Sequence, residues 1–254
     1  MADEARKGRY GYREIADELR ARIDGGELPP GSKVPGENEL MAQYGVEQPT
    51  ARRALDVLKN EGLIIARRGS GTYVREFRPI RRVSPDRLKT SVWGAGRSIW
   101  SSDVKDRPVA DDIQVTQEEA PAHIAHVLEL ESGAKVTVRR RKYLVEGRPV
   151  QLATSYYPAD LVAGSRITEI DTGPGGSYAR LKELGHEPVH FREELRARMP
   201  RGDEVGALGL SQGTPVIVIA RTAYTAENSP VEVNEMILDS GSYVLEYKFS
   251  SEAN

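Results

Sequence analysis

Basic and amide side chains gather at two places within residues 1–75, and their types and spacing suit contact with a nucleic acid. At the first place Gln48 and Arg52 are four residues apart, so in a helix both project from one face. An arginine can donate two hydrogen bonds to guanine, and a glutamine can bond to adenine in the same bidentate way. At the second place Gly69 follows two arginines, which would let the main chain approach a phosphate backbone closely. Taken singly these arginines could be solvated charges; together with their polar neighbours they form the DNA-contact candidates Asn38, Gln48, Thr50, Arg52, Arg53, Arg67, Arg68 and Gly69.

The apolar pattern predicts the elements that must position these side chains. Apolar residues recur at helical spacing over 12–23, which predicts an amphipathic helix. A short helix over 37–44 and a third helix from residue 48 follow, with Pro49 allowed in the first turn of the third. Two β-prone runs within 63–74 then enclose a tip rich in glycine and arginine. This order is typical of a winged helix-turn-helix, whose second motif helix enters the major groove of DNA.

The spaced proline, glycine and apolar positions of residues 12–74 resemble those of the GntR family of bacterial transcription regulators. The matching pieces are residues 28–40, 44–46, 50–55, 58, 61–64 and 69–74. The resemblance implies a dimeric DNA-binding regulator whose second domain senses a metabolite, with DNA contacts by Thr50, Arg52 and Gly69. Asn38 and Gln48 stand where the family commonly has arginine, so the bases read are expected to differ from the common family half-site.

Length and composition limit the function classes. A chain of 254 residues predicts two domains, and the absence of cysteine excludes disulfides, thiolate zinc sites and cysteine nucleophiles. No apolar run is long enough to span a membrane, so we expect a cytoplasmic protein. Residues 1–90 carry 18 Lys and Arg against 14 Asp and Glu, a net charge of +4, whereas the other 164 carry 18 against 24, a net charge of −6. This asymmetry favours contact of the first domain alone with a polyanion.

We predict a DNA-binding domain over 1–75, a proline-containing linker over 76–89 and an effector-binding and dimerisation domain over 90–254. The last domain should be α+β, because helical patterns near 121–130, 176–185 and 201–209 alternate with strand-like runs near 110–116, 135–145, 148–157, 187–198, 214–224, 230–239 and 243–249. Residues 130–249 resemble the UTRA ligand-sensing domain of the HutC-type subgroup. The matching pieces are residues 132–133, 139–141, 146–150, 154–158, 178, 208–210, 213–216 and 230–232. This resemblance implies a chorismate-lyase-like antiparallel sheet with flanking helices.

The same resemblance implies a small anionic effector held by basic and polar residues. Arg141 stands at a family ligand position with Tyr143 two residues on, while Ala153 replaces an acid that is common there. A glycine-rich loop over 173–178 precedes a predicted helix, whose free amides could attract an anion, although we favour a plain loop and helix cap as the explanation. The effector candidates are Arg141, Tyr143, Ser177, Glu232 and Tyr243.

Other motifs indicate ordinary structural roles. Each histidine pair, His123 with His126 and His186 with His190, lacks a third ligand, so no metal site is expected. Trp93 and Trp100 are seven residues apart and would share a helix face against the core or over a pocket; we favour the core.

The leading hypothesis is a homodimeric repressor that binds a palindromic double-stranded DNA operator and responds to a small-molecule effector. The chain has no nucleophile motif, catalytic residue set, metal set or cofactor fingerprint. The alternative is an enzyme domain of chorismate-lyase-like fold fused to a DNA-binding head.

Overall fold

The computed structural model describes residues 10–67, 69–76, 80–95 and 109–248. The chain divides into two compact units, and each is described by itself. The N-terminal unit comprises Met1–Arg78 together with Leu210–Thr214, and the C-terminal unit comprises Pro79–Gly209 and Pro215–Asn254.

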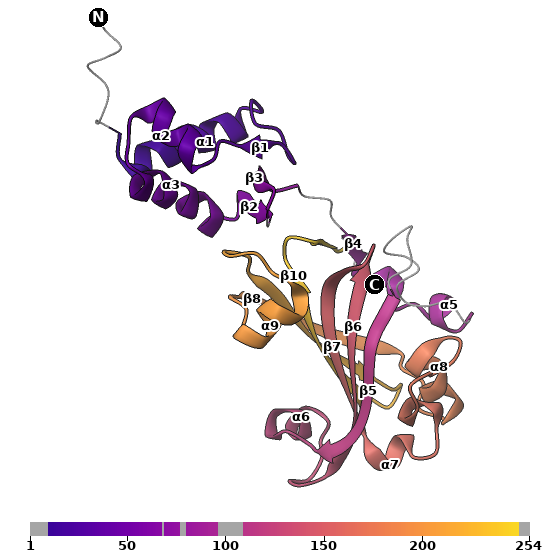
Figure 1. Ribbon diagram of the computed structural model, residues 1–254. Coiled ribbons are helices and arrows are strands. Elements are labelled where there is room, and N and C mark those ends of the chain that lie inside the picture. The colour runs from indigo at the N-terminus through magenta and orange to yellow at the C-terminus, as the bar shows by residue number, and fades with distance from the viewer. Residues whose placement is uncertain (1–9, 68, 77–79, 96–108, 249–254) are drawn as a thin grey trace, which may run out of the picture. The chain divides into compact units, whose positions relative to one another are not determined.

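The N-terminal unit is a helix-turn-helix followed by a hairpin, as the sequence predicted. It contains helices α1, α2 and α3 and strands β1, β2 and β3 (Figure 1), with the bounds α1 Tyr12–Asp24, β1 Lys33–Val34, α2 Glu37–Tyr44, α3 Gln48–Asn60, β2 Ile64–Arg67 and β3 Gly71–Val74. The turn between α2 and α3 requires Gly45, whose φ is 63°, a left-handed conformation that glycine adopts without steric cost. A buried core that includes Ile15, Leu19 and Leu58 joins the three helices.

One strand of this unit was not expected. Lys33 and Val34 pair with Tyr73 and Thr72, so β1 adds to the hairpin and gives a sheet of order β1-β3-β2. Two residues are too few to show the alternation that predicts a strand.

The C-terminal unit is built on a six-stranded antiparallel sheet of order β5-β6-β7-β10-β9-β8. The strands are β5 Val109–Glu119, β6 Lys135–Val145, β7 Arg148–Pro158, β8 His190–Arg198, β9 Val216–Tyr224 and β10 Pro230–Asp239. Six of the seven predicted strand runs therefore form one sheet, the run near 243–249 lies outside it, and the α+β character of the unit is confirmed. The flanking helices are α5 Thr90–Trp93, α6 Ala122–Val127, α7 Ala159–Val162, η3 Arg166–Thr168, α8 Gly176–Glu183 and α9 Gly202–Leu208 (Figure 1).

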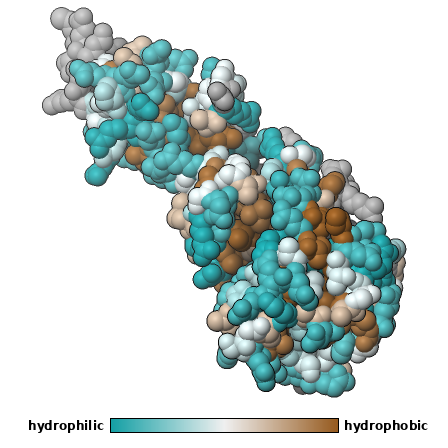
Figure 2. Space-filling model, turned by 60° about the horizontal axis from the view of Figure 1, so that its bottom comes forward, coloured by the Kyte–Doolittle hydropathy of each residue, from teal (hydrophilic) through white to brown (hydrophobic). Residues whose placement is uncertain are grey.

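Three buried clusters pack the helices and the short strands onto this sheet. Trp93 lies in one of them, where it is fully buried, donates its Nε1–H to the Leu88 carbonyl at 3.1 Å and meets the Tyr178 ring edge-on. The core interpretation therefore holds for Trp93, while Trp100 lies outside the described residues. Figure 2 shows hydrophilic side chains over most of the visible surface, with hydrophobic ones gathered in patches on the C-terminal unit.

The segment over 76–89, expected to be a linker, contains regular structure in the C-terminal unit. β4 Ile80–Val83 pairs in parallel with β11 Tyr243–Glu246, and α4 Ser84–Arg87 follows it directly. Arg82 is fully buried, because a carboxylate on a distant strand neutralises it. Proline content and charge predicted exposure here, since neither pattern reveals a partner so far away in sequence.

Candidate functional site

Helix α3 presents the first candidate surface. Its inner face buries Ala51, Ala54, Leu55 and Leu58, so the opposite face carries Gln48 and Arg52 into solvent. Thr50 is half-buried on the first turn, and Asn38 is exposed on α2. We define the recognition face as Gln48, Thr50 and Arg52. Helical spacing predicted this face because the apolar stripe fixes which side chains must point outward.

One residue of this face, Gln48, and its neighbour Arg53 are held by other side chains. Gln48 donates its Nε2–H to Glu37 Oε2 at 2.9 Å. The Arg53 guanidinium stacks on the Tyr12 ring, with its central carbon 4.4 Å from the ring centroid. In the described part of the chain no such contact fixes Arg52, so among the α3 arginines it is the one without a competing partner.

The hairpin between β2 and β3 forms the wing. Gly69 lies at its tip with φ of 72°, and a Cβ built there would meet nothing within 4 Å. Arg67 stacks on the Tyr73 ring at 4.6 Å, whereas Arg68 lies outside the described residues. Glu47 caps α3 through its backbone alone, since its side chain makes no capping hydrogen bond.

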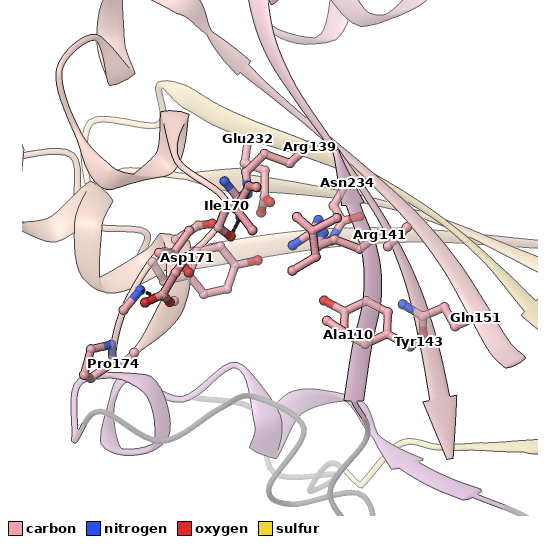
Figure 3. A pocket seen from close by; sticks show the side chains of 18 of the residues that line it. Ala110, Arg139, Arg141, Tyr143, Gln151, Ile170, Asp171, Pro174, Glu232 and Asn234 are labelled. Carbon is pink, nitrogen blue, oxygen red and sulfur yellow. Dashed lines mark hydrogen bonds between the residues drawn. The ribbon is translucent and has the colours of Figure 1, made fainter. Parts of the chain in front are cut away.

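The second candidate site is a cavity of about 410 Å³ in the C-terminal unit, which we call the arginine pocket. Strand residues such as Arg141, Tyr143 and Gln151 face the loop residues Asp171 and Pro174 across it (Figure 3). Its lining comprises Arg87, Ala110, Ile113, Arg139, Arg141, Tyr143, Gln151, Ala153, residues 170–178, Arg221, Glu232 and Asn234. Four arginines outnumber the two acids Asp171 and Glu232, so the pocket favours an anion.

Two arginines of the pocket, Arg141 and Arg221, remain charged despite burial. Burial alone would lower the pKa of Arg141, but the nearby Tyr143, Tyr157 and Glu232 outweigh it and raise that pKa. For Arg221, burial likewise acts to lower the pKa, and Tyr178, Glu232 and Glu193 raise it overall. Both side chains are therefore cations that can attract an anionic group.

Arg139 has a different role, because it bonds to the main chain of η3 and of the loop that follows it at the pocket wall. Its guanidinium donates to the carbonyls of Ile167 at 2.7 Å and Ile170 at 2.9 Å, and also to that of Glu169. Burial lowers the pKa of Arg139. Because both terminal nitrogens of Arg139 already donate to the main chain, Arg139 positions η3 and the residues that follow it rather than offering a free fork to a ligand.

Polar groups complete the pocket. Tyr157 donates its hydroxyl to Glu232 Oε1 at 2.6 Å, which fixes one oxygen of that carboxylate. Within the described residues the buried amide oxygens of Gln151 and Asn234 have no hydrogen-bond partner. Since buried polar atoms are normally bonded, these two oxygens suit the hydroxyl or amine donors of a ligand.

The glycine-rich loop approaches the helices closely. Gly175 is the N-cap of α8 with φ of 78°, and a Cβ there would lie 2.6 Å from the Trp93 carbonyl oxygen. Only glycine fits this position, which brings Ser177 and the first amides of α8 to the pocket wall.

The pocket brings together four of the five predicted effector residues, Arg141, Tyr143, Ser177 and Glu232. Tyr243 is not among its lining residues; it is buried on β11 and packs with Ile80 and Leu238. Sequence reasoning missed Arg87, Arg139 and Arg221. Arg221 carried a usable signal, because it is the single charge in the otherwise apolar run of β9.

The histidines lie apart and at the surface. His123 Nε2 is 3.2 Å from Glu235 Oε1, and the His190 ring bonds to Asn228 and stacks on Tyr224. Across the described ranges no group of three or more His, Asp or Glu side chains could hold a metal ion. No helix in those ranges is long and apolar enough to cross a membrane.

Comparisons with known proteins match each of the two units to a known domain family. Residues 11–74 match the model of bacterial regulatory proteins of the gntR family, and residues 105–243 match that of the UTRA domain. An uncharacterized HTH-type transcriptional regulator of Streptomyces coelicolor is 32% identical over 87% of this chain and 86% of its own length. The HTH-type transcriptional repressor NagR of Bacillus subtilis is 25% identical over 87% of each chain. A crystal structure of a GntR-family transcriptional regulator, 27% identical, superposes with a TM-score of 0.64 over 95% of this chain and 98% of its own.

A winged helix-turn-helix unit joined in one chain to a unit with a charged pocket defines a transcription regulator that responds to a small molecule. The chain belongs to the GntR family of bacterial transcription regulators, and its residues 105–243 form a UTRA domain. The family consists of regulators rather than enzymes, so the fused-enzyme alternative is set aside.

Proposed function

We propose that this protein is a homodimeric repressor that binds a palindromic operator and releases it when a small anionic metabolite enters the arginine pocket. Residues 1–75 would carry DNA binding, and residues 90–254 would carry effector binding and dimerisation in the cytoplasm. The observation that supports the effector class is the excess of buried arginines over acids around one pocket. The exposed recognition face of α3 supports direct reading of the major groove.

The pocket also supports a more specific description of the metabolite. An anionic group would lie between Arg141, Arg221 and the loop that carries Ser177, and hydroxyl or amine donors would face Glu232, Gln151 and Asn234. Glu232 thus supplies from β10 the acid that is missing at Ala153. A compact, polar monoanion or dianion fits a cavity of this size.

The test is a thermal-shift screen of phosphorylated and carboxylated metabolites against their uncharged parents, with wild-type protein and two variants. Arg141→Ala should lose the stabilisation that an anion gives to wild-type protein. Arg140→Ala is the matched control, because Arg140 is the next residue of β6 but pairs with Glu118 and does not line the pocket. Equal stabilisation of the Arg141→Ala and Arg140→Ala variants by the anion would place the effector site elsewhere. Sedimentation of the protein with operator DNA tests whether it binds as a homodimer.

A further inference from the structure

Glu193, on strand β8, lies between the arginine pocket and the segment over 80–87. It is almost fully buried, with 9% of its side chain exposed, and it does not line the pocket itself. Arg82 of β4 forms a two-pronged ion pair with it, and Ser84 at the start of α4 donates its hydroxyl to Glu193 Oε2 at 2.9 Å. Glu193 therefore holds two side chains of a segment that the sequence marked as a linker.

The same carboxylate also faces the pocket from behind. Arg221 of β9 lines the pocket, and its Nη1 is 3.8 Å from Glu193 Oε1. Strands β8 and β9 place Glu193 directly opposite Arg221 in register. One anionic group thus neutralises one cation of the pocket and one cation of the 80–87 segment, and both cations are almost fully buried.

We propose that Glu193 is a positioning residue that couples anion binding in the arginine pocket to the hold on residues 80–87. The proposal rests on the effector pocket described above. An anion that binds Arg221 competes with Glu193 for that guanidinium, so the charge of Glu193 becomes more available to Arg82 and Ser84. Arg87 gives a second link, because it ends α4 and lines the pocket directly.

This arrangement predicts an opposite response of two measurable properties. Without the negative charge of Glu193, Arg221 has lost a competitor and should bind an anion several-fold more tightly. At the same time the 80–87 segment should stop responding to that anion, because the shared counter-ion is gone. General damage to the fold would weaken anion binding instead, so the combination of tighter binding and lost response distinguishes a coupling role from a merely structural one.

The experiment uses the full-length protein with inorganic phosphate as the probe and potassium chloride at matched ionic strength as the blank. Affinity is measured by the phosphate dependence of the thermal midpoint. The response of the segment is measured by hydrogen exchange of the amides of Ile80–Val83. In wild-type protein phosphate should slow this exchange several-fold. In Glu193→Gln it should leave the exchange unchanged while the dissociation constant for phosphate falls several-fold.

Glu194→Gln is the matched control, because Glu194 is the next residue of β8, is exposed and pairs only loosely with Arg192 at 3.5 Å. It should behave as wild type. Ser84→Ala provides a milder second variant should Glu193→Gln unfold: it removes one hydrogen bond to Glu193 and should reduce the exchange response while phosphate affinity stays the same.

Each result decides between the two proposals. Equal exchange responses in wild type, Glu193→Gln and Ser84→Ala would overturn the coupling role and leave the pocket intact as an anion site. Failure of phosphate to stabilise even the wild-type protein would overturn the pocket as an anion site, and the coupling with it.

Discussion

The two units use arginine in opposite ways. In the N-terminal unit Arg52, Arg53 and Arg67 are exposed, and their contacts within the protein are at most a ring face. In the C-terminal unit Arg82, Arg139 and Arg221 are buried and are matched by carboxylates or carbonyls of the same unit. Exposed arginines suit a partner that is larger than the unit and supplies its own phosphates. Buried arginines suit a small ligand that must displace or complement an existing counter-ion.

The largest expected effect is the loss of a buried cation. Arg82→Ala leaves the buried Glu193 without its main partner and should destabilise the C-terminal unit by about 3–5 kcal/mol. Arg20→Ala is the counterpart in the N-terminal unit, where Arg20 pairs with Asp17 and Glu61 at the surface, and should cost about 0–1 kcal/mol. Urea unfolding measures the stability loss of both variants. Tryptophan fluorescence reports on the C-terminal unit, since Trp93 and Trp100 are the only tryptophans in the chain. Similar losses of stability in Arg82→Ala and Arg20→Ala would contradict the proposed difference between buried and exposed arginines.

The second largest expected effect is a loss of stability of the C-terminal unit in acid. Burial alone would raise the pKa of Glu193, but Arg82, Arg221 and Ser84 lower it to about 2. Because the folded pKa lies below the usual value, Glu193 stabilises the fold above pH of about 5, and this contribution disappears as pH falls toward 2. The stability gap between wild type and Glu193→Gln should therefore narrow by about 3 kcal/mol over that range. A gap that stays constant from pH 6 to pH 2 would contradict the assigned ion pair.

The recognition face should show a smaller effect that depends on DNA sequence. Arg52→Ala should lose about 1–3 kcal/mol of operator affinity and relax specificity at one symmetric base pair. Arg53→Ala is the control, because its guanidinium stacks on Tyr12 and should contribute less to base reading. Fluorescence anisotropy with operator and scrambled DNA measures both. We would abandon the base-reading role of Arg52 if the two variants lost the same affinity for both DNAs.

The smallest effect concerns Glu37, which holds the Gln48 amide in place. Glu37→Ala should reduce discrimination at the base pair that Gln48 reads by about 0.5–1.5 kcal/mol, the net value of one hydrogen bond. In a Gln48→Ala background the same change should have no further effect on base preference. Competition binding against operators changed at single positions gives this double-mutant cycle. An equal effect of Glu37→Ala in both backgrounds would mean that the Gln48 amide is not what Glu37 positions.

Local sequence patterns predicted an element well where its own apolar residues repeat at helical or strand spacing. The predicted helix over 12–23 matches α1, and the helix over 37–44 matches α2, because their apolar stripes and terminal glycines are local signals. Strands β1 and β4 were missed because each is short and is defined by a partner elsewhere in the chain. The pocket contains four residues that the sequence suggested, Arg141, Tyr143, Ser177 and Glu232. Arg87 enters it by long-range packing that no sequence spacing records, and the sequence signal of Arg221 was its charge within an apolar strand.

The parallel pairing of β4 with β11 has a consequence for how the chain is made. About 160 residues separate Val83 from Tyr243, so during synthesis β4 leaves the ribosome long before its partner strand exists. The N-terminal unit can complete its three-helix core early, whereas the Ile80–Val83 strand must wait for the last part of the chain. A nascent or prematurely terminated chain that ends before Tyr243 would carry a winged helix with β4 unpaired. Such a product keeps the recognition face of α3 but lacks the strand that anchors residues 80–83. Synthesis of the chain through β11 therefore matters more to the ligand response than to the DNA-contact surface.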